Sequence, residues 1–305
     1  MQTAELLRKV RRLEIRSRHL VEDLFAGQSS SIFKGRGIEF EEVRHYVPGD
    51  EVRDIDWNVT ARMGAPFVKR FVEERELTVV LVVDISRSMR FGTSGPEKRE
   101  LAAELAAILG FAALQHNDRV GLVLAGREVE HFVRPARGRT HVLRLLRDVL
   151  GAESKAGGTR LSHAARFVSR TARRRSVVFW ISDFEDRLEP RDWKVLGRRH
   201  DVTAIALRDP RDDVVPAVGW VELEDLETGR RELVNTNSRR VREAYQREAR
   251  ERKREVERVL GEARVPLLDL RTDRNYLPVL LRYFSARRRR APGRAGGAAA
   301  AREPE

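Results

Sequence analysis

The sequence predicts an α/β protein with a doubly wound, mostly parallel sheet and helices on both of its faces. Two observations lead to this fold class. Apolar runs of strand length alternate with helix-period segments over residues 77–210. Several of these runs also carry no charge, as expected of parallel strands that helices cover on both sides.

Two segments of different character precede the alternating region. Residues 2–25 predict a helix, because apolar side chains recur there at near-helical spacing. That stripe consists of Leu6, Leu7, Val10, Leu13, Ile15, Leu20 and Leu24. Residues 35–76 mix apolar and acidic positions around a Pro-Gly-Asp turn, so we expect short strands and loops packed on the main domain.

The alternating region begins with its clearest strand, the branched and uncharged run over residues 77–83. The elements expected next are a helix from Pro96 to about His116, a strand over 119–125 and a third strand linked to it by a hairpin. They are followed by helices over 138–151 and 160–173, a strand over 176–181, a helix over 190–199 and a strand in DVTAIALRD.

The remaining chain predicts additions to this core. We expect an antiparallel hairpin with its turn at Thr228–Gly229, a long charged helix over 237–263, a strand in VPLLDLRT and a helix over 275–287. The basic, Ala/Gly-rich end has no apolar pattern and predicts disorder. The predicted division is an N-terminal extension (1–76), an α/β domain with C-terminal helical additions (77–285) and a disordered tail (286–305).

Composition restricts the class of protein. The 305-residue chain has no cysteine, which excludes disulfides, thiolate zinc sites and cysteine nucleophiles and fits a reducing compartment. No apolar run approaches the roughly 20 residues that span a bilayer, and the N-terminal segment lacks the apolar core of a signal peptide. We expect a cytoplasmic protein without a transmembrane segment; peripheral contact with a membrane stays open.

The charge balance bears on the partner. The formal net charge is +13, and much of the excess lies near the two ends of the chain. Such a charge favours an acidic partner: nucleic acid, an anionic membrane or an acidic protein surface. No zinc finger or aromatic RNA-binding motif is present, and the helix over 237–263 alternates arginine with glutamate, as in a face that pairs with itself. We therefore expect nucleic acid not to be the partner.

Polar side chains follow the predicted strands at one edge of the sheet. Asp84, Ser86 and Ser88 stand at alternate positions in LVVDISRSMR, so an extended turn would point one carboxylate and two hydroxyls the same way. Thr159 in AGGT precedes a predicted helix, and Asp183 in WISDF ends another predicted strand. Ligands of doubly wound sheets bind at this carboxyl edge, beside a topological switch point.

Five oxygen-bearing side chains from three loops suit a hard divalent cation. Mg²⁺ accepts such ligands and keeps some water, and Mn²⁺ or Ca²⁺ are the alternatives. Simpler roles compete with this interpretation. Ser86, Ser88 or Thr159 could each cap a helix, and Asp183 could form a turn. Their occurrence together, in this order, at three predicted strand ends favours the metal site.

These motifs resemble a known pattern. D-I-S-R-S-M after a buried strand, then G-G-T, then S-D-F after a second strand, are similar to the metal-ion-dependent adhesion site of von Willebrand factor A-like domains. The segment RGIEFEEVRHYVPGDEVRDIDWNVTARMGAPFVKRFVEERE resembles the signature of a bacterial family, domain of unknown function 58. NDRVGLVLAGREVEHFVRPARG and the spacing to GGTRL resemble it too, over roughly residues 30–210.

The resemblance implies roles for single residues. Asp84, Ser86 and Ser88 take the first-loop roles, Thr159 the second and Asp183 the third, where it would act on the metal through water. Many relatives have a threonine before that aspartate and a glycine after it, where this chain has Ser182 and Phe184. Ser182 can still offer a hydroxyl, whereas Phe184 could narrow the approach for a partner.

The function that the resemblance implies is recognition, not catalysis. Such a site leaves one metal position for a carboxylate of another protein. Members of the family resemble partners of MoxR-type AAA+ ATPases that act in chaperone-like remodelling of client proteins. We accordingly expect a protein-binding adaptor that takes no small-molecule substrate and has no catalytic residue.

Two alternatives stay open. A metal-dependent phosphoryl-transfer enzyme would use Asp84, but such sites usually carry a second aspartate where Ser86 stands. No phosphate-binding G-x-x-x-x-G-K-[ST] motif or H-E-x-x-H spacing is present either. A nucleic-acid-binding protein would use the basic surface. Within residues 35–76, Tyr46, Trp57 and the nearby acids either form a functional surface or simply pack and pair with arginines.

Overall fold

The protein is described by a computed structural model that covers residues 3–25, 38–47, 50, 52, 55–73, 77–93, 95–154, 158–224 and 229–290. The chain divides into two compact units. The smaller unit spans Phe33–Leu77, and the larger combines Met1–Ile32 with Thr78–Glu305. The larger unit contains the predicted α/β sheet and every residue predicted to bind the metal.

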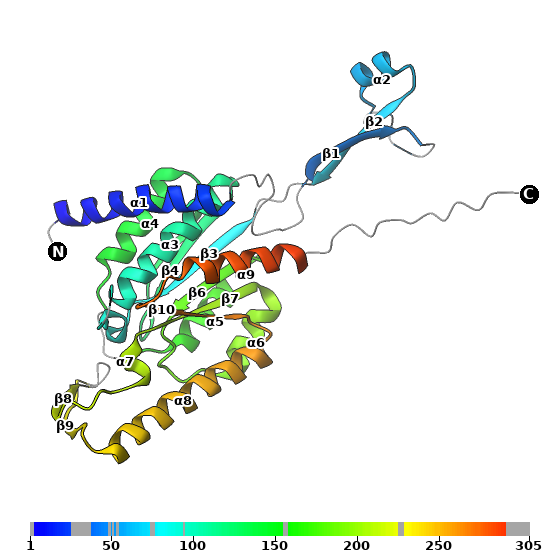
Figure 1. Ribbon diagram of the computed structural model, residues 1–305. Helices are drawn as coiled ribbons and strands as arrows, with labels where there is room; N and C mark the ends of the chain where they lie inside the picture. Colours follow the sequence, from blue (N-terminus) through cyan, green and yellow to red (C-terminus); the bar gives the residue numbers. More distant parts are fainter. Residues whose placement is uncertain are drawn as a thin grey trace, which may run out of the picture. The chain divides into compact units, whose positions relative to one another are not determined.

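The larger unit is built on a six-stranded sheet with the order β10-β7-β6-β3-β4-β5 (Figure 1). Its strands are β3 (Thr78–Asp84), β4 (Arg119–Ala125), β5 (Val129–Ala136), β6 (Val177–Ser182), β7 (Asp201–Arg208) and β10 (Leu267–Arg271). All neighbouring pairs are parallel except β4 and β5, which form an antiparallel hairpin. The predicted doubly wound, mostly parallel α/β class is therefore confirmed.

Helices cover both faces of this sheet. The helices of the larger unit are α1 (Thr3–Phe25), α3 (Lys98–Gln115), α4 (Arg139–Gly151), α5 (Leu161–Thr171), α6 (Pro190–Arg199), the short α7 (Pro210–Asp213), α8 (Arg239–Glu262) and α9 (Leu277–Arg290). A short 3₁₀ turn, η2 (Arg87–Arg90), follows β3. A second antiparallel hairpin joins β8 (Trp220–Glu224) to β9 (Arg231–Asn235); most of its predicted turn lies outside the described residues.

The alternation of side chains along β6 shows how the two faces are filled. Trp180 packs against Trp193 of α6 at a ring separation of 4.7 Å, within a core that also contains residues of α5 and α8. Phe179 points to the opposite face and meets Phe284 of α9 at 6.2 Å. Because every residue of β6 is buried, the strand has no polar face, as its uncharged sequence predicts.

Helix α3 is enclosed on more than one side. It is alanine-rich and almost entirely buried, because it lies between the sheet and the helices α1 and α4 (Figure 1). Helix α1, which we grouped with the N-terminal extension, thus belongs to the larger unit. Its inward face contains Val10 and Val21, whereas Leu7 and Ile15 of the predicted stripe are more than half exposed.

In its described residues, the smaller unit contains an antiparallel pair of strands and a helix that lies between them in the sequence. Its elements are β1 (Ile38–His45), α2 (Trp57–Met63) and β2 (Phe67–Glu73). Asp56 caps α2 by accepting from the backbone of Asn58 and Val59. Arg44 pairs with Asp50 at 2.6 Å, as the packing alternative expected, whereas Trp57 is 65% exposed.

Two further observations concern the ends and the surface of the chain. Helix α9 continues to Arg290, which lies past the predicted start of the disordered tail at residue 286; residues 291–305 lie outside the described part. Among the described residues, none of the helices has the length and apolarity needed to cross a membrane.

Candidate metal centre

The position of Asp84 follows from the order of the strands. From β3 the chain proceeds to β4 on one side of it, and later returns to β6 on the other side. The carboxyl ends of β3 and β6 therefore frame a topological switch point, the usual place for a ligand in an open α/β sheet. Asp84 is the last residue of β3, and Ser182 and Asp183 stand at the end of β6.

The Asp84 carboxylate bridges these two strand ends. Its Oδ1 accepts a hydrogen bond from the backbone N–H of Ser86 at 2.9 Å. Its Oδ2 accepts one from the Ser182 hydroxyl at 2.6 Å. The side chain is buried, so this carboxylate meets protein groups instead of bulk water. Ser182, which we expected to offer a hydroxyl at the end of β6, therefore donates that hydroxyl to the carboxylate of Asp84.

Ser86 and Ser88 converge as their alternate spacing predicts. Their hydroxyl oxygens lie 3.0 Å apart and both residues are buried. Ser88 lies within the 3₁₀ turn η2, not in an extended turn, and Ser86 occupies the N-cap position of η2 without a capping side-chain bond. The capping alternative therefore does not account for the Ser86 hydroxyl.

Thr159 lies half-buried in the loop between α4 and α5. The N-cap position of α5 belongs to Arg160, so Thr159 is not its N-cap residue. The backbone N–H of Arg160 donates to the carbonyl of Gly126 at 3.1 Å, just after the end of β4. Because Ala125 of β4 is paired with Asp84, the Thr159 loop reaches the same edge of the sheet.

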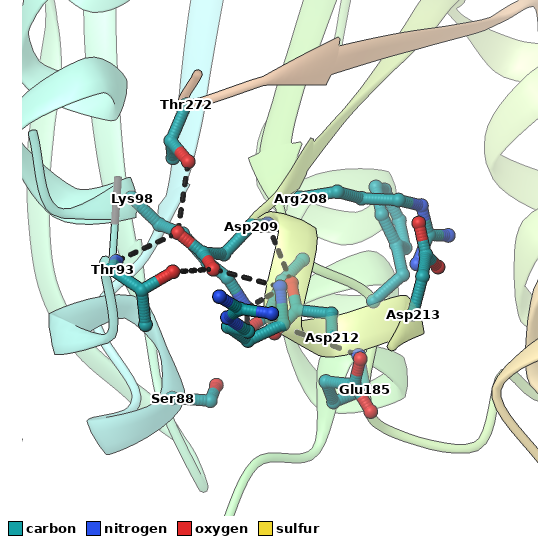
Figure 2. Close-up of polar contacts among 12 residues, drawn as sticks. Ser88, Thr93, Lys98, Glu185, Arg208, Asp209, Asp212, Asp213 and Thr272 are labelled. Carbon is teal, nitrogen blue, oxygen red and sulfur yellow. Dashed lines mark hydrogen bonds and ion pairs between the residues drawn. The ribbon is translucent and has the colours of Figure 1, made fainter. Parts of the chain in front are cut away.

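Asp183 has a partner that the sequence interpretation missed. The ammonium nitrogen of Lys98 lies 3.1 Å from Asp183 Oδ2 and 2.8 Å from Asp212 Oδ2, and its side chain is only 2% exposed. Figure 2 shows Lys98 reaching toward Asp212 of α7. Lys98 shares a helical stripe with Leu101 and Leu105, which face inward. That spacing was the available signal, because it predicts a lysine turned toward the sheet.

The charges of this cluster do not balance. Asp183 and Asp212 flank one ammonium, and the carboxylate of Asp84 lies close to Asp183, so these four groups sum to 1 − 3 = −2 when all are ionised. Burial and the nearby Asp183 raise the pKa of Asp84 to about 7. Burial lowers the pKa of Lys98, but attraction by Asp183 and Asp212 outweighs it and keeps the ammonium charged.

Glu185 and Asp209 complete the polar rim. Burial and repulsion by Asp183 raise the pKa of Glu185, although Arg252 lies 3.2 Å from its carboxylate. Asp209 accepts from the backbone and hydroxyl of Thr93 at 2.8 and 2.5 Å, and from the hydroxyl of Thr272 at 3.0 Å (Figure 2). It thereby ties the loops after η2, β7 and β10 together beside the cluster.

Phe184 does not occupy the rim. Its ring is buried in the core and lies 5.9 Å from the ring of Trp193. Its backbone has φ 55°, the left-handed region that glycine adopts most readily, at the position where the resemblance implies glycine. Phe184 thus adopts the backbone conformation of the expected glycine, although it is a bulky residue. Because its ring is buried in the core, the ring does not narrow a partner's approach to the site, contrary to our expectation.

An open groove of about 470 Å³ leads to the cluster. Ser88, Lys98 and Glu185 line it, and the segment before and within β8 supplies apolar residues such as Val215 and Val221. A partner segment could therefore reach the rim without displacing a core side chain.

The donor set fits a hard cation in its chemistry. Within the described ranges, no group of three His, Cys, Asp or Glu side chains has the arrangement of a metal site. The predicted metal site contains only two such carboxylates, Asp84 and Asp183, and its other ligands are hydroxyls. The adjacent hydroxyls of Ser86 and Ser88 and an Asp84 carboxylate whose charge is poorly compensated match that set.

Comparison with known proteins identifies sequence relatives. The sequence model of a family described as "Protein of unknown function DUF58" matches residues 42–255. "Uncharacterized protein Rv1480" of Mycobacterium tuberculosis is 36% identical over 293 residues, which cover 94% of this chain and 91% of that protein.

Solved structures with a similar arrangement are much more distant in sequence. The hypothetical protein BatB of Bacteroides thetaiotaomicron is 15% identical and has a TM-score of 0.46, with 70% of this chain and 99% of that chain covered. A structure described as the SpRpn10 VWA domain is 10% identical and has a TM-score of 0.39, with coverages of 68% and 95%.

Proposed function

This chain belongs to the DUF58 family of proteins of unknown function, and we propose that it is a protein-binding adaptor that holds a carboxylate of its partner through a divalent cation. The main support is the meeting of Asp84, Ser86, Ser88 and Ser182 at the switch point. An oxygen-lined, negatively charged cluster of this kind attracts a hard cation, which in turn can accept an incoming carboxylate.

The residues have distinct roles in this proposal. Asp84, Ser86 and Ser88 would hold the cation directly, Thr159 would approach it from the second loop, and Asp183 would act on it through water. Lys98 keeps Asp183 in place and supplies part of the compensating charge. Mg²⁺ is the proposed ion, with Mn²⁺ or Ca²⁺ as alternatives. When bound, the cation supplies the positive charge that receives the partner's carboxylate.

The partner class is proposed from the resemblance. A MoxR-type AAA+ ATPase, or a client that it remodels, would supply the carboxylate, and the adaptor would take part in chaperone-like remodelling or assembly. The groove of about 470 Å³ beside Ser88 and Lys98 gives a protein segment room to reach the rim. No catalytic residue is proposed, because recognition by coordination breaks no bond.

Metal binding can be tested by calorimetric titration of the full chain with MgCl₂. Wild type should bind the ion, and the Asp84→Ala/Ser86→Ala double variant should not. Asp213→Ala is the matched control, since this carboxylate lies on the same rim but outside the cluster. Circular dichroism checks that each variant is folded. Equal magnesium affinity in all three proteins would refute the site.

Partner binding requires a second measurement. Immobilised wild type should retain a purified MoxR-type ATPase from the same source in magnesium, and should lose it in chelator or with the double variant. Retention of the ATPase under every condition would show that it does not bind through the metal. Turnover of a phosphoester that disappears in Asp84→Asn would instead favour the enzyme alternative.

A further inference from the structure

Arginines line two grooves on either side of helix α5, away from the candidate metal centre. The first groove, of about 800 Å³, lies along α5 and α6. Its arginines are Arg160, Arg166, Arg170, Arg187, Arg191 and Arg199. The second, of about 650 Å³, lies along α5 and the ends of β4 and β5, and contains Arg119, Arg134, Arg170, Arg173 and Arg174. Arg170 lines both, so we treat them as one arginine surface.

Most arginines of the first groove form no ion pair with another described residue of the protein. Arg166 lies 3.7 Å from Asp192, a long ion pair. Over the part of the chain that the structure covers, the other five have no carboxylate within ion-pair distance, and all six side chains are exposed. Apart from Arg166, which reaches from α5 to Asp192 of α6, these arginines form no ion pair between the described elements.

The arginines of helix α8 provide a comparison, because several of them form ion pairs within their own helix. Arg239, Arg252 and Arg258 each pair with a glutamate three or four positions away, at 2.5 to 3.0 Å. Such pairs compensate charge within the helix. The first groove of the arginine surface instead combines six arginines with three carboxylates, and the second is lined by five arginines and, among the described residues, no carboxylate. Like charges at such close range repel one another. Folding alone gives no reason for that arrangement.

We propose that the arginine surface is a binding site for an acidic segment of a protein partner, separate from the candidate metal centre. The guanidinium fork pairs with carboxylates in a defined geometry, so several exposed arginines along a groove suit a chain of Asp and Glu side chains. Helix α5 has 11 residues, and its length of about 16 Å matches an extended segment of about five residues.

The position of the surface fits a partner that also reaches the rim of the sheet. Arg160 directly follows Thr159, so the first groove begins beside the second loop of the candidate metal centre. Arg173 and Arg174 lie past the other end of α5. A partner could therefore touch the metal rim and extend along α5, although the arginine surface needs no metal for its charge.

Acidic protein fits this surface better than nucleic acid does. Asp186, Glu189 and Asp192 stand among the arginines of the first groove. A nucleic acid carries phosphates at short, regular intervals and would bring some of them against these carboxylates. A protein segment can space its acids so that they meet arginines alone. The interspersed carboxylates thus favour a polypeptide.

The test measures fluorescence anisotropy with the full chain in EDTA. The probe is a labelled peptide of alternating glutamate and glycine long enough to span α5, and a labelled oligothymidylate of equal charge is the comparison. The triple variant Arg166→Glu/Arg170→Glu/Arg191→Glu should raise the peptide Kd about tenfold or more. The milder glutamine set at the same positions should weaken binding in the same direction.

The matched control reverses three exposed arginines of α8, in the variant Arg240→Glu/Arg247→Glu/Arg254→Glu. It changes the net charge from +13 by the same −6, to +7, and should leave the Kd within about twofold. The proposal would be overturned if both triple variants lost the same affinity for the peptide, or if wild type did not bind the peptide. Tighter binding of the oligothymidylate, lost in the groove variant, would assign the surface to nucleic acid. Because EDTA is present throughout, failure of the metal proposal leaves this result unaffected.

Discussion

At the scale of single residues, the main feature of the site is that charged side chains lie close together in the protein interior. Asp84 and Asp183 end neighbouring strands, so their charges face each other, and Lys98 compensates only Asp183 and Asp212 directly. The pKa of Asp84 rises to about 7 because its carboxylate is buried near Asp183 and no cation pairs with it directly among the described residues. Two predictions follow from this imbalance, one for Asp84 and one for Lys98.

The pKa of Asp84 predicts a pH-dependent stability of the metal-free protein. Its ordinary value is 3.8, so the folded state holds the proton more tightly than the unfolded chain does. Its contribution is therefore favourable at low pH and is lost as the pH rises from about 4 to about 7. Across that window wild type should lose about 1.4 kcal/mol per pH unit relative to Asp84→Asn. Urea unfolding in EDTA measures this difference, and parallel curves for the two proteins would contradict it.

Removing the Lys98 ammonium should expose the charge of its two carboxylates. Lys98→Met leaves Asp183 and Asp212 buried without their cation, which should lower the free energy of unfolding by about 3–5 kcal/mol. Magnesium should restore more stability to this variant than to wild type, because the divalent cation supplies part of the missing positive charge. Thermal unfolding with and without MgCl₂ measures both effects.

The control for that variant is Lys194→Met. Lys194 pairs with Glu262 at 2.8 Å, but both side chains are well exposed, so the change should cost under about 1 kcal/mol. Magnesium should act on this control as it does on wild type. An equal gain from magnesium in Lys98→Met and in wild type would show that the ion does not bind near Lys98.

At the scale of elements, the rim is rigid because loops from distant parts of the chain are tied together. Asp209 caps α7 and accepts hydrogen bonds from Thr93 and Thr272, which belong to the loops after η2 and β10. Burial raises the pKa of Asp209, but these hydrogen bonds outweigh it and hold the pKa below its ordinary value. An ionised carboxylate thus anchors three loops beside the candidate metal centre.

Loss of this anchor should be costly. Asp209→Ala removes a buried carboxylate and leaves the hydroxyl of buried Thr272, together with the N–H and hydroxyl of Thr93, without their acceptor, and it should lower the free energy of unfolding by about 3 kcal/mol. Asp213→Ala removes a partly exposed carboxylate of the same helix and should cost under about 1 kcal/mol. Chemical denaturation measures both values. A similar small loss in the two variants would mean that the network contributes little.

At the scale of the whole molecule, two kinds of surface stand out on the larger unit. One is the negatively charged rim at the carboxyl edge, and the other is the arginine surface along α5. A net charge of +13 describes neither of them, because it is a sum over the whole chain and does not report local excesses of carboxylates or of arginines. The smaller unit contributes its own exposed aromatic residue, Trp57.

The sequence by itself determined the fold class and the loops that bear the candidate ligands. Uncharged strands such as β3 and β6 must be covered on both faces, and polar residues at their carboxyl ends must meet at one edge. Asp84, Ser86 and Ser88 could be selected from that rule alone. The predicted start of the disordered tail and the stripe of α1 were less accurate, because packing against α3 and α4, not spacing alone, decides which side of α1 is buried.

Only the tertiary structure decided which charges meet across the sheet. Lys98 is 85 positions from Asp183 and 114 from Asp212, and Ser182 is 98 from Asp84. Local patterning reports which side of an element is buried, but it does not report which residue of another element faces it there. The raised pKa of Asp84, the anchored rim and the arginine surface all depend on such long-range neighbours, which arise only when the strands adopt their order in the sheet.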